Sequence, residues 1–485
     1  MSKANKRAML AFVGVLAALV GCEGAAGLPG ADGPPGAPGM NGSPGTDGAR
    51  GAAGADGIGG LVGPPGDPGD PAVIDLLNAG IVGWLPENRT ALNALITSRG
   101  RTSPTFDPMH PPVAVFDWDN TVLKNDIGDA TFFWMINNDK ILQPPGRDWS
   151  LTNSALTPAA RAALNANCDA LAAPGAPLPT GAGTAGAILC ADTLYHIYND
   201  GVVGATGSAA AWTSAITLTT NQPYAWVAQL MAGYRPSEIR QFARYAFDEN
   251  NWAPIGATQT VGSISATGYV RIYEAIDDLI DALQYAGFDV WVVSASPQYA
   301  VEEVAAEVNV QRDHVIGIRS VLTAPSAPPV ATDPPRGLIT YNVQGCGTVA
   351  DGANTLITFD VGKRCWINKV IFHIPAATQM DRAPLAQRAV FAAGDSDTDI
   401  AMIKDATDLK LVINRGKTQI MCNAYAGMRS RWLIQPMFIS PRACRTTAFT
   451  CDTALDAAGM PIVDETGVVF PPPPPAIMDT ICTLP

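Results

Sequence analysis

Histidine is scarce in this chain, and the four that occur (His110, His196, His314 and His373) are scattered along it. Their separation indicates structural roles rather than a shared metal site. No pair of cysteines shows the C-x2-C spacing that is typical of zinc sites. Positive charge is also in deficit, since the formal net charge is −13. A nucleic-acid partner needs a basic face for its phosphates, so the charge balance argues against such a partner.

The apolar run at residues 9–20 is too short for an ordinary transmembrane helix but suits the core of a signal peptide, and Lys3, Lys6 and Arg7 precede it. It ends in Leu19-Val20-Gly21-Cys22, which resembles the lipobox of bacterial lipoproteins. An ordinary signal peptide with a chance cysteine is the alternative. We expect residues 1–22 to be a lipoprotein signal peptide and Cys22 to be the lipidation site. The protein would then be exported and lipid-anchored, with Glu23 favouring the outer membrane.

Glycine recurs at every third position over residues 24–69, and several of these triplets contain proline. This is the G-X-Y pattern of collagen, in which only glycine fits at the crowded axis of the triple helix. We therefore expect a collagen-like stalk over residues 23–71. It would form either a homotrimeric rod that lifts the rest of the chain off the membrane or a Gly/Pro-rich tether.

Cysteine is frequent enough for several disulfides, since nine occur and eight remain once Cys22 is set aside. An even number of cysteines in an exported chain favours disulfides. The full pairing does not follow from the sequence. Cys168 with Cys190 and Cys346 with Cys365 are plausible local pairs.

Apolar runs that alternate with helical patterns predict an α/β fold, namely a Rossmann-like parallel sheet flanked by helices. The strand candidates are residues 113–116, 288–293, 314–320, 356–359, 389–393 and 409–413. Residues 72–100 are predicted to be helical. Residues 124–280 form a mostly helical insertion, which we interpret as a cap. The core would comprise residues 72–123 and 281–450, with a Pro-rich loop at 324–336 and a Pro-rich tail at 451–485.

The most informative motif is Asp117-Trp118-Asp119-Asn120, which follows the apolar run at residues 113–116 and leads into Thr121. A short apolar run before a turn is typical of a buried strand. Two carboxylates at the end of such a strand do not suit a core. They do suit a site at the carboxyl edge of a parallel sheet, where open α/β folds bind their ligands.

Three later segments place polar or charged residues at comparable points. Ser294 ends an apolar run, Lys363 opens an amphipathic helical pattern, and Asp395 and Asp399 lie in an acidic loop after residues 389–393. Lys369, six residues beyond Lys363, is a competing candidate for the lysine.

Taken in order, the DxDxT, Ser, Lys and GDxxxD segments resemble the haloacid dehalogenase superfamily of phosphotransferases. The resemblance spans roughly residues 105–440. In that superfamily a second Asp at the position of Asp119 marks phosphatases, so the resemblance implies a phosphomonoester hydrolase. The insertion resembles the helical caps of phosphoserine phosphatase-like members. The chain also looks similar to exported bacterial phosphorylcholine phosphatases.

The chemistry of phosphoryl transfer suggests roles for these residues. A carboxylate that attacks a phosphoryl group meets negative charge, which a divalent cation offsets, and oxygen ligands suit Mg²⁺. We expect Asp117 to be the nucleophile that forms an aspartyl-phosphate, and Asp119 to be the general acid and then the base. Ser294 and Lys363 would bind phosphate oxygens, and Asp395 would complete the Mg²⁺ site with Asp117. The resemblance adds the backbone carbonyl of Asp119 as a metal ligand, with Thr121 and Asp399 in support.

The expected substrate is a small phosphorylated metabolite, because a cap that closes over the sheet edge excludes water and sets specificity. The cap is rich in aromatic residues, which can accept a quaternary ammonium group through cation–π contacts. Phosphorylcholine is therefore a candidate, as is a phosphoserine-like compound. The alternative is a non-catalytic surface adhesion or scaffold lipoprotein that uses the collagen-like stalk.

Overall fold

The computed structural model describes residues 77–205, 208–214, 216–324, 337–451 and 476–485. The expected signal peptide, Cys22, the collagen-like repeat, nearly all of the loop at 324–336 and most of the tail at 451–485 lie outside these described residues. Within the described ranges, no helix combines the length and the apolar composition that crossing a bilayer requires.

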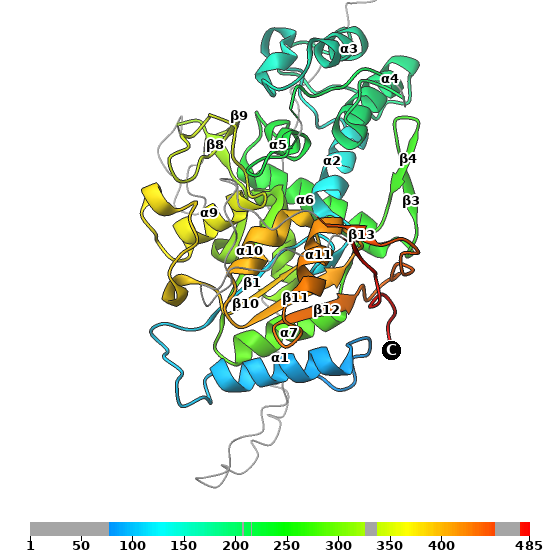
Figure 1. Ribbon diagram of the computed structural model, residues 1–485. Helices are drawn as coiled ribbons and strands as arrows, with labels where there is room; N and C mark the ends of the chain where they lie inside the picture. Colours follow the sequence, from blue (N-terminus) through cyan, green and yellow to red (C-terminus); the bar gives the residue numbers. More distant parts are fainter. Residues whose placement is uncertain (1–76, 206–207, 215, 325–336, 452–475) are drawn as a thin grey trace, which may run out of the picture. The chain divides into compact units, whose positions relative to one another are not determined.

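A six-stranded sheet in the order β12-β11-β10-β1-β6-β7, with every pair parallel, forms the centre of the described chain (Figure 1). Its strands are β1 (Val113–Phe116), β6 (Asp289–Pro297), β7 (Val315–Ile318), β10 (Phe391–Gly394), β11 (Leu409–Asn414) and β12 (Trp432–Pro436). Phe116 at the end of β1 pairs with Ala393 on one side and Val292 on the other. Strand order reverses at β1, so the carboxyl end of β1 is the switch point at which such sheets bind ligands.

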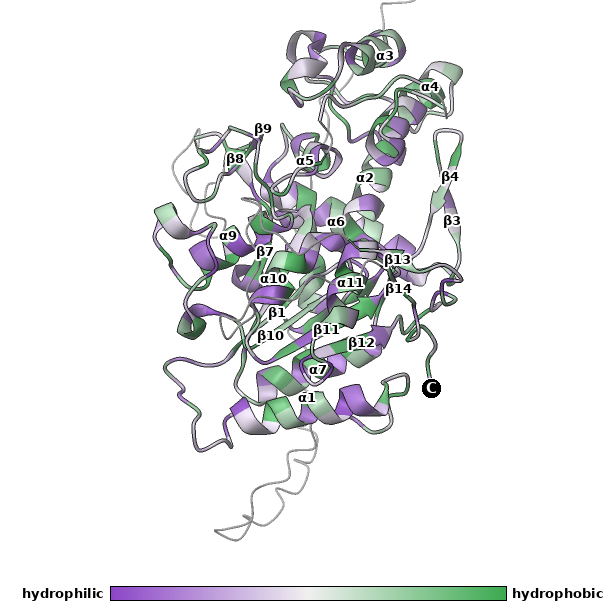
Figure 2. Cartoon of the chain, in the orientation of Figure 1, coloured by the Kyte–Doolittle hydropathy of each residue, from purple (hydrophilic) through white to green (hydrophobic). Residues whose placement is uncertain are grey.

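Helices cover both faces of this sheet. Ala114 and Phe116 of β1 pack in one apolar core, whereas Val113 and Val115 pack in the other, as the alternation of side chains along a strand requires. The first core includes α1 (Pro86–Arg99), α7 (Glu274–Tyr285) and α8 (Gln298–Val304), and the second includes α9 (Val361–Val370), α10 (Ile400–Asp405) and α11 (Thr418–Ala426). Helix α1 carries both hydrophilic and hydrophobic residues along its length (Figure 2), because only one of its sides is buried. The predicted α/β fold is confirmed.

The segment between β1 and β6 is mainly helical, as predicted. Its helices are α2 (Ile127–Asn137), α3 (Pro158–Cys168), α4 (Ala185–Tyr195), α5 (Gln222–Gln229) and α6 (Pro236–Trp252). It also contains a hairpin of β3 (Thr258–Val261) and β4 (Ile264–Thr267). The short strands β2 (Leu123–Lys124) and β5 (Arg271–Ile272) pair where the insertion leaves and rejoins the core.

Four disulfides are present in the described residues, and both local pairs suggested by the sequence are among them. Cys168–Cys190 joins α3 to α4, and Cys346–Cys365 joins α9 to the loop after β9 (Ile339–Val343), which pairs with β8 (Ser320–Leu322). The other two are Cys422–Cys451 and Cys444–Cys482. The remaining strands, β13 (Phe449–Thr450) and β14 (Ala476–Ile477), pair with each other, and Cys451 directly follows β13.

One predicted strand is wrong, and one predicted helix is shorter than expected in the described residues. Residues 356–359 form no strand, because Ile357 and Phe359 fill a small core beside α5 and Leu356 packs in the second core, while Ile357 N–H donates to the Thr219 carbonyl. The helix predicted over 72–100 begins only at Pro86, a residue that suits the first helical turn, and residues 77–85 are turns and extended chain. An apolar run alone does not distinguish a strand from other buried chain. Strands β9 and β12 were not predicted.

Candidate functional site

The loop after β1 is shaped by Trp118, which lies between the two carboxylates of the motif. Its side chain is fully buried, and its carbonyl accepts hydrogen bonds from the N–H groups of Thr121, Val122 and Leu123. This tight turn leaves the carboxylates of Asp117 and Asp119 on the wall of a cavity at the carboxyl edge of the sheet. The apolar residue between the two acids is thus an anchor for the turn.

Asp117 is held by one residue from another segment and by one from its own loop. The Lys363 ammonium, at the start of α9, lies 2.6 Å from Asp117 Oδ1, and the Thr121 hydroxyl donates to Asp117 Oδ2 at 3.0 Å. Asp117 is 5% exposed and Lys363 is fully buried. Such a contact fixes the orientation of the carboxylate and partly neutralises it.

Asp399 completes this arrangement from the loop after β10. Its Oδ1 accepts from Lys363 at 2.6 Å, and its Oδ2 accepts from the backbone N–H groups of Asp395 and Ser396 at 3.1 and 3.0 Å. Both oxygens are therefore engaged by the protein. Asp399 is placed to position Lys363 and the Asp395 loop rather than to bind a ligand.

Asp395 lies beside Asp117 with a different set of contacts. Arg415, the first residue after β11, donates through Nη1 to Asp395 Oδ2 at 2.9 Å, and Thr121 Oγ1 lies 3.5 Å from Asp395 Oδ1. Asp117, Asp395 and Asp399 each offer a carboxylate oxygen within 4.8 Å of the others. Because Asp399 is already engaged by Lys363 and the loop, the buried oxygens of Asp117 and Asp395 are the ones with the donor chemistry that suits a hard divalent cation.

Asp119 lies at the other end of the cavity, against the cap. Its Oδ1 accepts from the N–H of Ile127 at 2.7 Å, and its Oδ2 accepts from the hydroxyls of Ser296 at 2.7 Å and Ser294 at 3.2 Å. Both the first turn of α2 and the end of β6 thus hold this carboxylate in place. Among the described residues, Asp117 and Asp119 share no hydrogen-bond partner, so the two acids can take separate roles.

Burial dominates the electrostatics of the site. It raises the pKa of Asp117 well above the usual range, with a further increase from Asp399 that the Lys363 charge opposes. Burial likewise raises the pKa of Asp119 well above its usual range, and the charges of Asp126 and Asp117 add to this effect. Burial tends to lower the pKa of Lys363, but Asp117 and Asp399 outweigh it and raise that pKa, so the ammonium stays charged.

The structure brings most of the predicted residues together at one edge of the sheet. Lys363, rather than Lys369, reaches the carboxylates, since the Lys369 ammonium donates to the Gly345 carbonyl at 3.0 Å and lies over the Trp366 ring. Ser294 contacts Asp119, yet neither Ser294 nor Lys363 is among the described residues that line the cavity.

Several further residues line the cavity. They are Asp126 and Gly128 at the start of α2, Tyr198, Tyr224 and Val227 of the cap, Ser296 and its neighbours Ala295 and Pro297, Ser396, Thr398 and Arg415. No role was predicted for Arg415, although its position just after the strand predicted at 409–413 indicates the same edge of the sheet. Asp397, between the predicted Asp395 and Asp399, accepts from Ile420 N–H at 2.9 Å and joins the acidic loop to α11.

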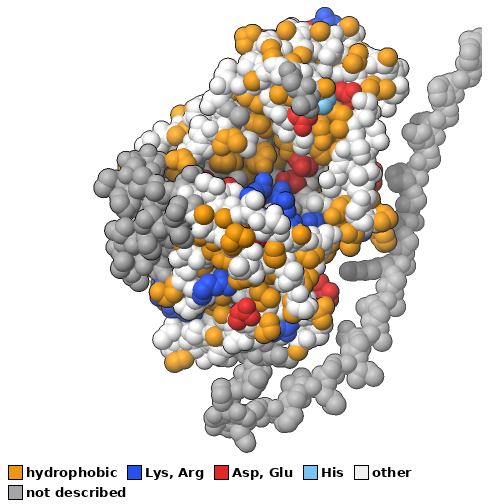
Figure 3. Space-filling view, turned by 45° about the vertical axis from the view of Figure 1, so that its right-hand side comes forward, with side chains coloured by type: hydrophobic (Ala, Val, Ile, Leu, Met, Phe, Trp, Pro, Cys, Tyr) orange, Lys and Arg blue, Asp and Glu red, His pale blue; other side chains and the backbone are white. Residues whose placement is uncertain are grey.

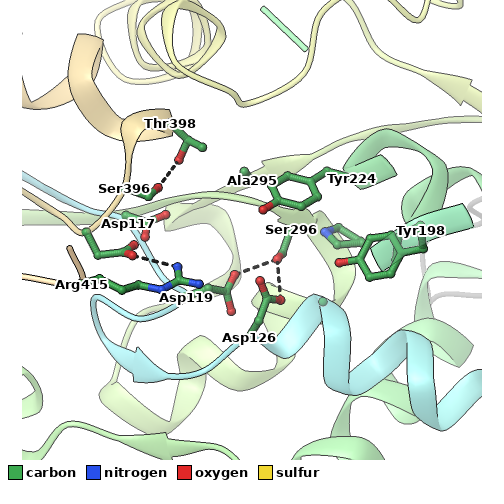
Figure 4. Close-up of a pocket in the computed structure, with 14 residues that line it drawn as sticks. Asp117, Asp119, Asp126, Tyr198, Tyr224, Ala295, Ser296, Ser396, Thr398 and Arg415 are labelled. Carbon is green, nitrogen blue, oxygen red and sulfur yellow. Dashed lines mark hydrogen bonds and ion pairs between the residues drawn. The ribbon is translucent and has the colours of Figure 1, made fainter. Parts of the chain in front are cut away.

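Figure 4 shows how the lining residues face one another. The Ser296 hydroxyl lies between the carboxylates of Asp119 and Asp126, and the Arg415 guanidinium points across the cavity toward Asp119. On the molecular surface, acidic side chains lie within a hollow and basic side chains lie along its lower rim (Figure 3). Acidic and basic groups thus face the same cavity.

A second cavity of about 280 Å³ adjoins the first and shares Asp126, Tyr198, Tyr224 and Arg415 with it. It also contains Asp129, whose carboxylate accepts a hydrogen bond from the Tyr198 hydroxyl. Burial raises the pKa of Asp129 to about 8, and the charge of Asp126 adds to the effect. The wall of this second cavity is therefore acidic and aromatic.

Residues 19–74 match the collagen triple helix repeat, which confirms the predicted collagen-like segment. No curated protein matches the chain. Among solved structures, a conserved protein of unknown function from Anaerococcus prevotii DSM 20548 is similar. It is 19% identical with a TM-score of 0.51, and the likeness covers 73% of this chain and 93% of that one. This likeness shows that the two proteins share a fold.

Two more distant structural neighbours are a protein of unknown function from Bordetella pertussis Tohama I and a substrate-bound phosphoserine phosphatase. The first is 16% identical with a TM-score of 0.36, covering 67% of this chain and 98% of that one. The second is 12% identical with a TM-score of 0.27, covering 62% of this chain and 85% of that one. At these TM-scores the likeness is too remote to indicate what this chain does.

Proposed function

We propose that the protein is a Mg²⁺-dependent phosphomonoester hydrolase of the haloacid dehalogenase type, acting on a small phosphorylated metabolite. One observation carries the proposal. The buried carboxylate of Asp117 and the half-buried carboxylate of Asp119 have separate partners and open into the same cavity beside a third carboxylate, Asp395. A site that performs nucleophilic attack and proton transfer on one substrate needs two acidic groups that act independently.

In this mechanism Asp117 attacks phosphorus and the bond to the leaving oxygen breaks. Lys363 and Thr121 hold the attacking carboxylate and keep it from turning away. Asp119, whose pKa burial raises, gives its proton to the leaving oxygen. The resulting Asp119 carboxylate then takes a proton from water, which attacks phosphorus, releases phosphate and restores Asp117.

The metal proposal rests on the surplus of negative charge. Asp117, Asp119, Asp395 and Asp399 meet at the site, whereas two cations, Lys363 and Arg415, contact them directly among the described residues. Asp117 and Asp395, with the backbone carbonyl of Asp119, would hold Mg²⁺, and Asp399 would support them. When bound, the cation offsets the repulsion between carboxylate and phosphate and stabilises the transition state.

The second cavity suggests a leaving group with a positive charge. Asp126, Asp129, Tyr198 and Tyr224 would face it. Aromatic rings attract cations, and a bound cation favours the ionised form of each nearby carboxyl group. Phosphorylcholine and phosphoserine-like compounds fit this requirement. We expect a lower KM for such substrates than for glycerol phosphate, whose leaving group carries no charge. Equal KM values would remove the cationic preference but leave the hydrolase assignment standing.

The test of the reaction uses the purified full-length protein and a generic aryl phosphate. We expect release of phosphate with Mg²⁺ and its loss in EDTA. The Asp117→Asn variant should be inactive because an amide is a poor nucleophile. Asp281→Asn, which changes an exposed carboxylate on α7, is the matched control and should retain activity. An intact Asp117→Asn protein with unchanged activity would overturn the mechanism.

We also propose that the enzyme is exported and lipid-anchored through Cys22, with the collagen-like repeat as a stalk between membrane and enzyme. The apolar run before Cys22 and the repeat over residues 24–69 support this arrangement. Cys22→Ser should move the protein from the membrane fraction to the soluble fraction. Sedimentation of the full chain and of a variant lacking residues 24–71 tests trimer formation, and a monomer in both cases would exclude it.

A further inference from the structure

The two residues expected to bind phosphate oxygens are poorly placed to meet the phosphate. Ser294 and Lys363 are fully buried, and neither lines the cavity in the described chain. The Ser294 hydroxyl already contacts Asp119 and the N–H of Ser296, and the Lys363 ammonium contacts two carboxylates. A phosphate dianion that enters therefore faces mainly carboxylates. Something else must supply a positive, hydrogen-bonding surface.

Arg415 has the required position. Among the described residues that line the first cavity it is the one cation, and it also lines the second cavity, so it lies where the two meet. Its side chain is 33% exposed. In the described part of the chain, its guanidinium makes one side-chain hydrogen bond, from Nη1 to Asp395. The other N–H groups can therefore face a ligand.

The backbone around Arg415 fixes the residue at this point. The Arg442 guanidinium donates to the Arg415 carbonyl at 2.9 Å. Asp397 caps the start of α11 just beyond it, which ties the Arg415 loop to the Asp395 loop. Lys124 and Lys417 stand close enough that the Arg415 charge lowers the pKa of each, in addition to the larger effect of burial. The rim beside Arg415 is thus positive in a chain of negative net charge.

We propose that Arg415 binds the phosphoryl group of the substrate. The planar guanidinium offers two parallel N–H groups that match two phosphate oxygens, which a lysine ammonium does not. Its contact with Asp395 aims it into the cavity. Arg415 is then a substrate-binding residue, and it supplies the positive surface that Ser294 and Lys363 do not present. This inference rests on the proposed hydrolase function.

The experiment compares Arg415→Met, Arg415→Lys and the wild-type full-length protein at saturating Mg²⁺. We expect the KM for an aryl phosphate and the inhibition constant of vanadate to rise together in Arg415→Met, by roughly 10- to 100-fold, as for the loss of a hydrogen bond to a charged group. Arg415→Lys should recover only part of this loss. Lys417→Met removes one charge from the same loop, outside the cavity lining, and should change both constants less than about threefold.

Two results would overturn the inference. If KM and vanadate inhibition stay unchanged in Arg415→Met while the Mg²⁺ concentration for half-activity rises, then Arg415 only holds Asp395. If Lys417→Met has as large an effect as Arg415→Met, then the general positive field is responsible. Calorimetric binding of inorganic phosphate separates this inference from the proposed function. Suppose that the wild type binds inorganic phosphate but hydrolyses no phosphomonoester, and that Arg415→Met no longer binds phosphate. This result would support the anion site and contradict the hydrolase function.

Discussion

The Lys363 ammonium lies 2.6 Å from both Asp117 Oδ1 and Asp399 Oδ1, in a fully buried position between the loops after β1 and β10. Replacing it with methionine leaves two carboxylates without their shared cation. We expect Lys363→Met to lower the free energy of unfolding by about 3–5 kcal/mol, the usual cost of removing one partner of a buried ion pair. We also expect kcat to fall by about 10²–10³-fold, because Asp117 loses a preorganised partner.

Lys369→Met is the matched control, because this lysine lies on the same helix, is half-buried and rests over the Trp366 ring. Its loss should cost about 0.5–1 kcal/mol and leave kcat unchanged. Denaturant unfolding and steady-state kinetics on both variants measure the difference. Equal effects on kcat would show that the Lys363–Asp117 contact has no special role.

The sequence was sufficient to predict five of the six strands of the sheet and the acids at its edge, because both depend on local patterns. Strand β1 is an apolar run and the DxD motif directly follows it, so residue order placed Asp117 and Asp119 without further information. Arg415 and Asp126 were harder to assign, since neither belongs to a motif. They reach the cavity only because β11 and α2 end or begin there, and strand order is a long-range property.

The residues at 356–359 show the opposite difficulty. They have the composition of a strand but pack against α5, and Thr358 donates from its hydroxyl to the Ser294 carbonyl. Burial was predictable from their apolar character, whereas pairing depended on whether a neighbouring strand had a free edge. The sequence pattern therefore indicates burial but does not indicate strand pairing.

The disulfide Cys346–Cys365 restrains the helix that carries Lys363, since Cys365 lies two residues further along α9. We expect the double variant Cys346→Ser/Cys365→Ser to lose both stability and kcat. Cys168→Ser/Cys190→Ser, in the cap, is the control, because its loop is of similar length, with sequence separations of 22 and 19. Each should cost about 3 kcal/mol in stability by the chain-entropy estimate. If the cap variant loses as much kcat as the α9 variant, the positioning role is excluded.

Gly394, the last residue of β10, permits the close approach of Asp399. A Cβ atom at this glycine would lie 2.7 Å from both the Cβ and Oδ2 atoms of Asp399. We expect Gly394→Ala to displace that carboxylate, cost about 1–3 kcal/mol of stability and lower kcat through Lys363. Gly186→Ala in α4 is the control, since its Cβ would meet only the Leu171 side chain at 3.3 Å. A fully active Gly394→Ala protein would show that the position of Asp399 is not critical.

The raised pKa of Asp129 predicts a specific pH dependence of the free energy of unfolding. Burial and the Asp126 charge raise its pKa to about 8 in the folded protein, whereas an unfolded chain has a carboxyl pKa of about 3.9. Between these values the folded state holds a proton that the unfolded state has released. The stability from this group is therefore complete below about pH 4 and is lost as pH rises toward about 8.

The Asp129→Asn variant removes this titration and still offers an oxygen to the Tyr198 hydroxyl. We expect its free energy of unfolding to fall less than that of the wild type between about pH 5 and about pH 8, and to exceed it at the upper end. Asp248→Asn, at a half-buried position on α6, should keep the wild-type slope. Chemical denaturation across this range gives the comparison. If the free energies of unfolding of the wild type and Asp129→Asn change in parallel with pH, then Asp129 is ionised in the folded protein. The acidic wall proposed to receive a cationic leaving group would then already carry its charge at neutral pH.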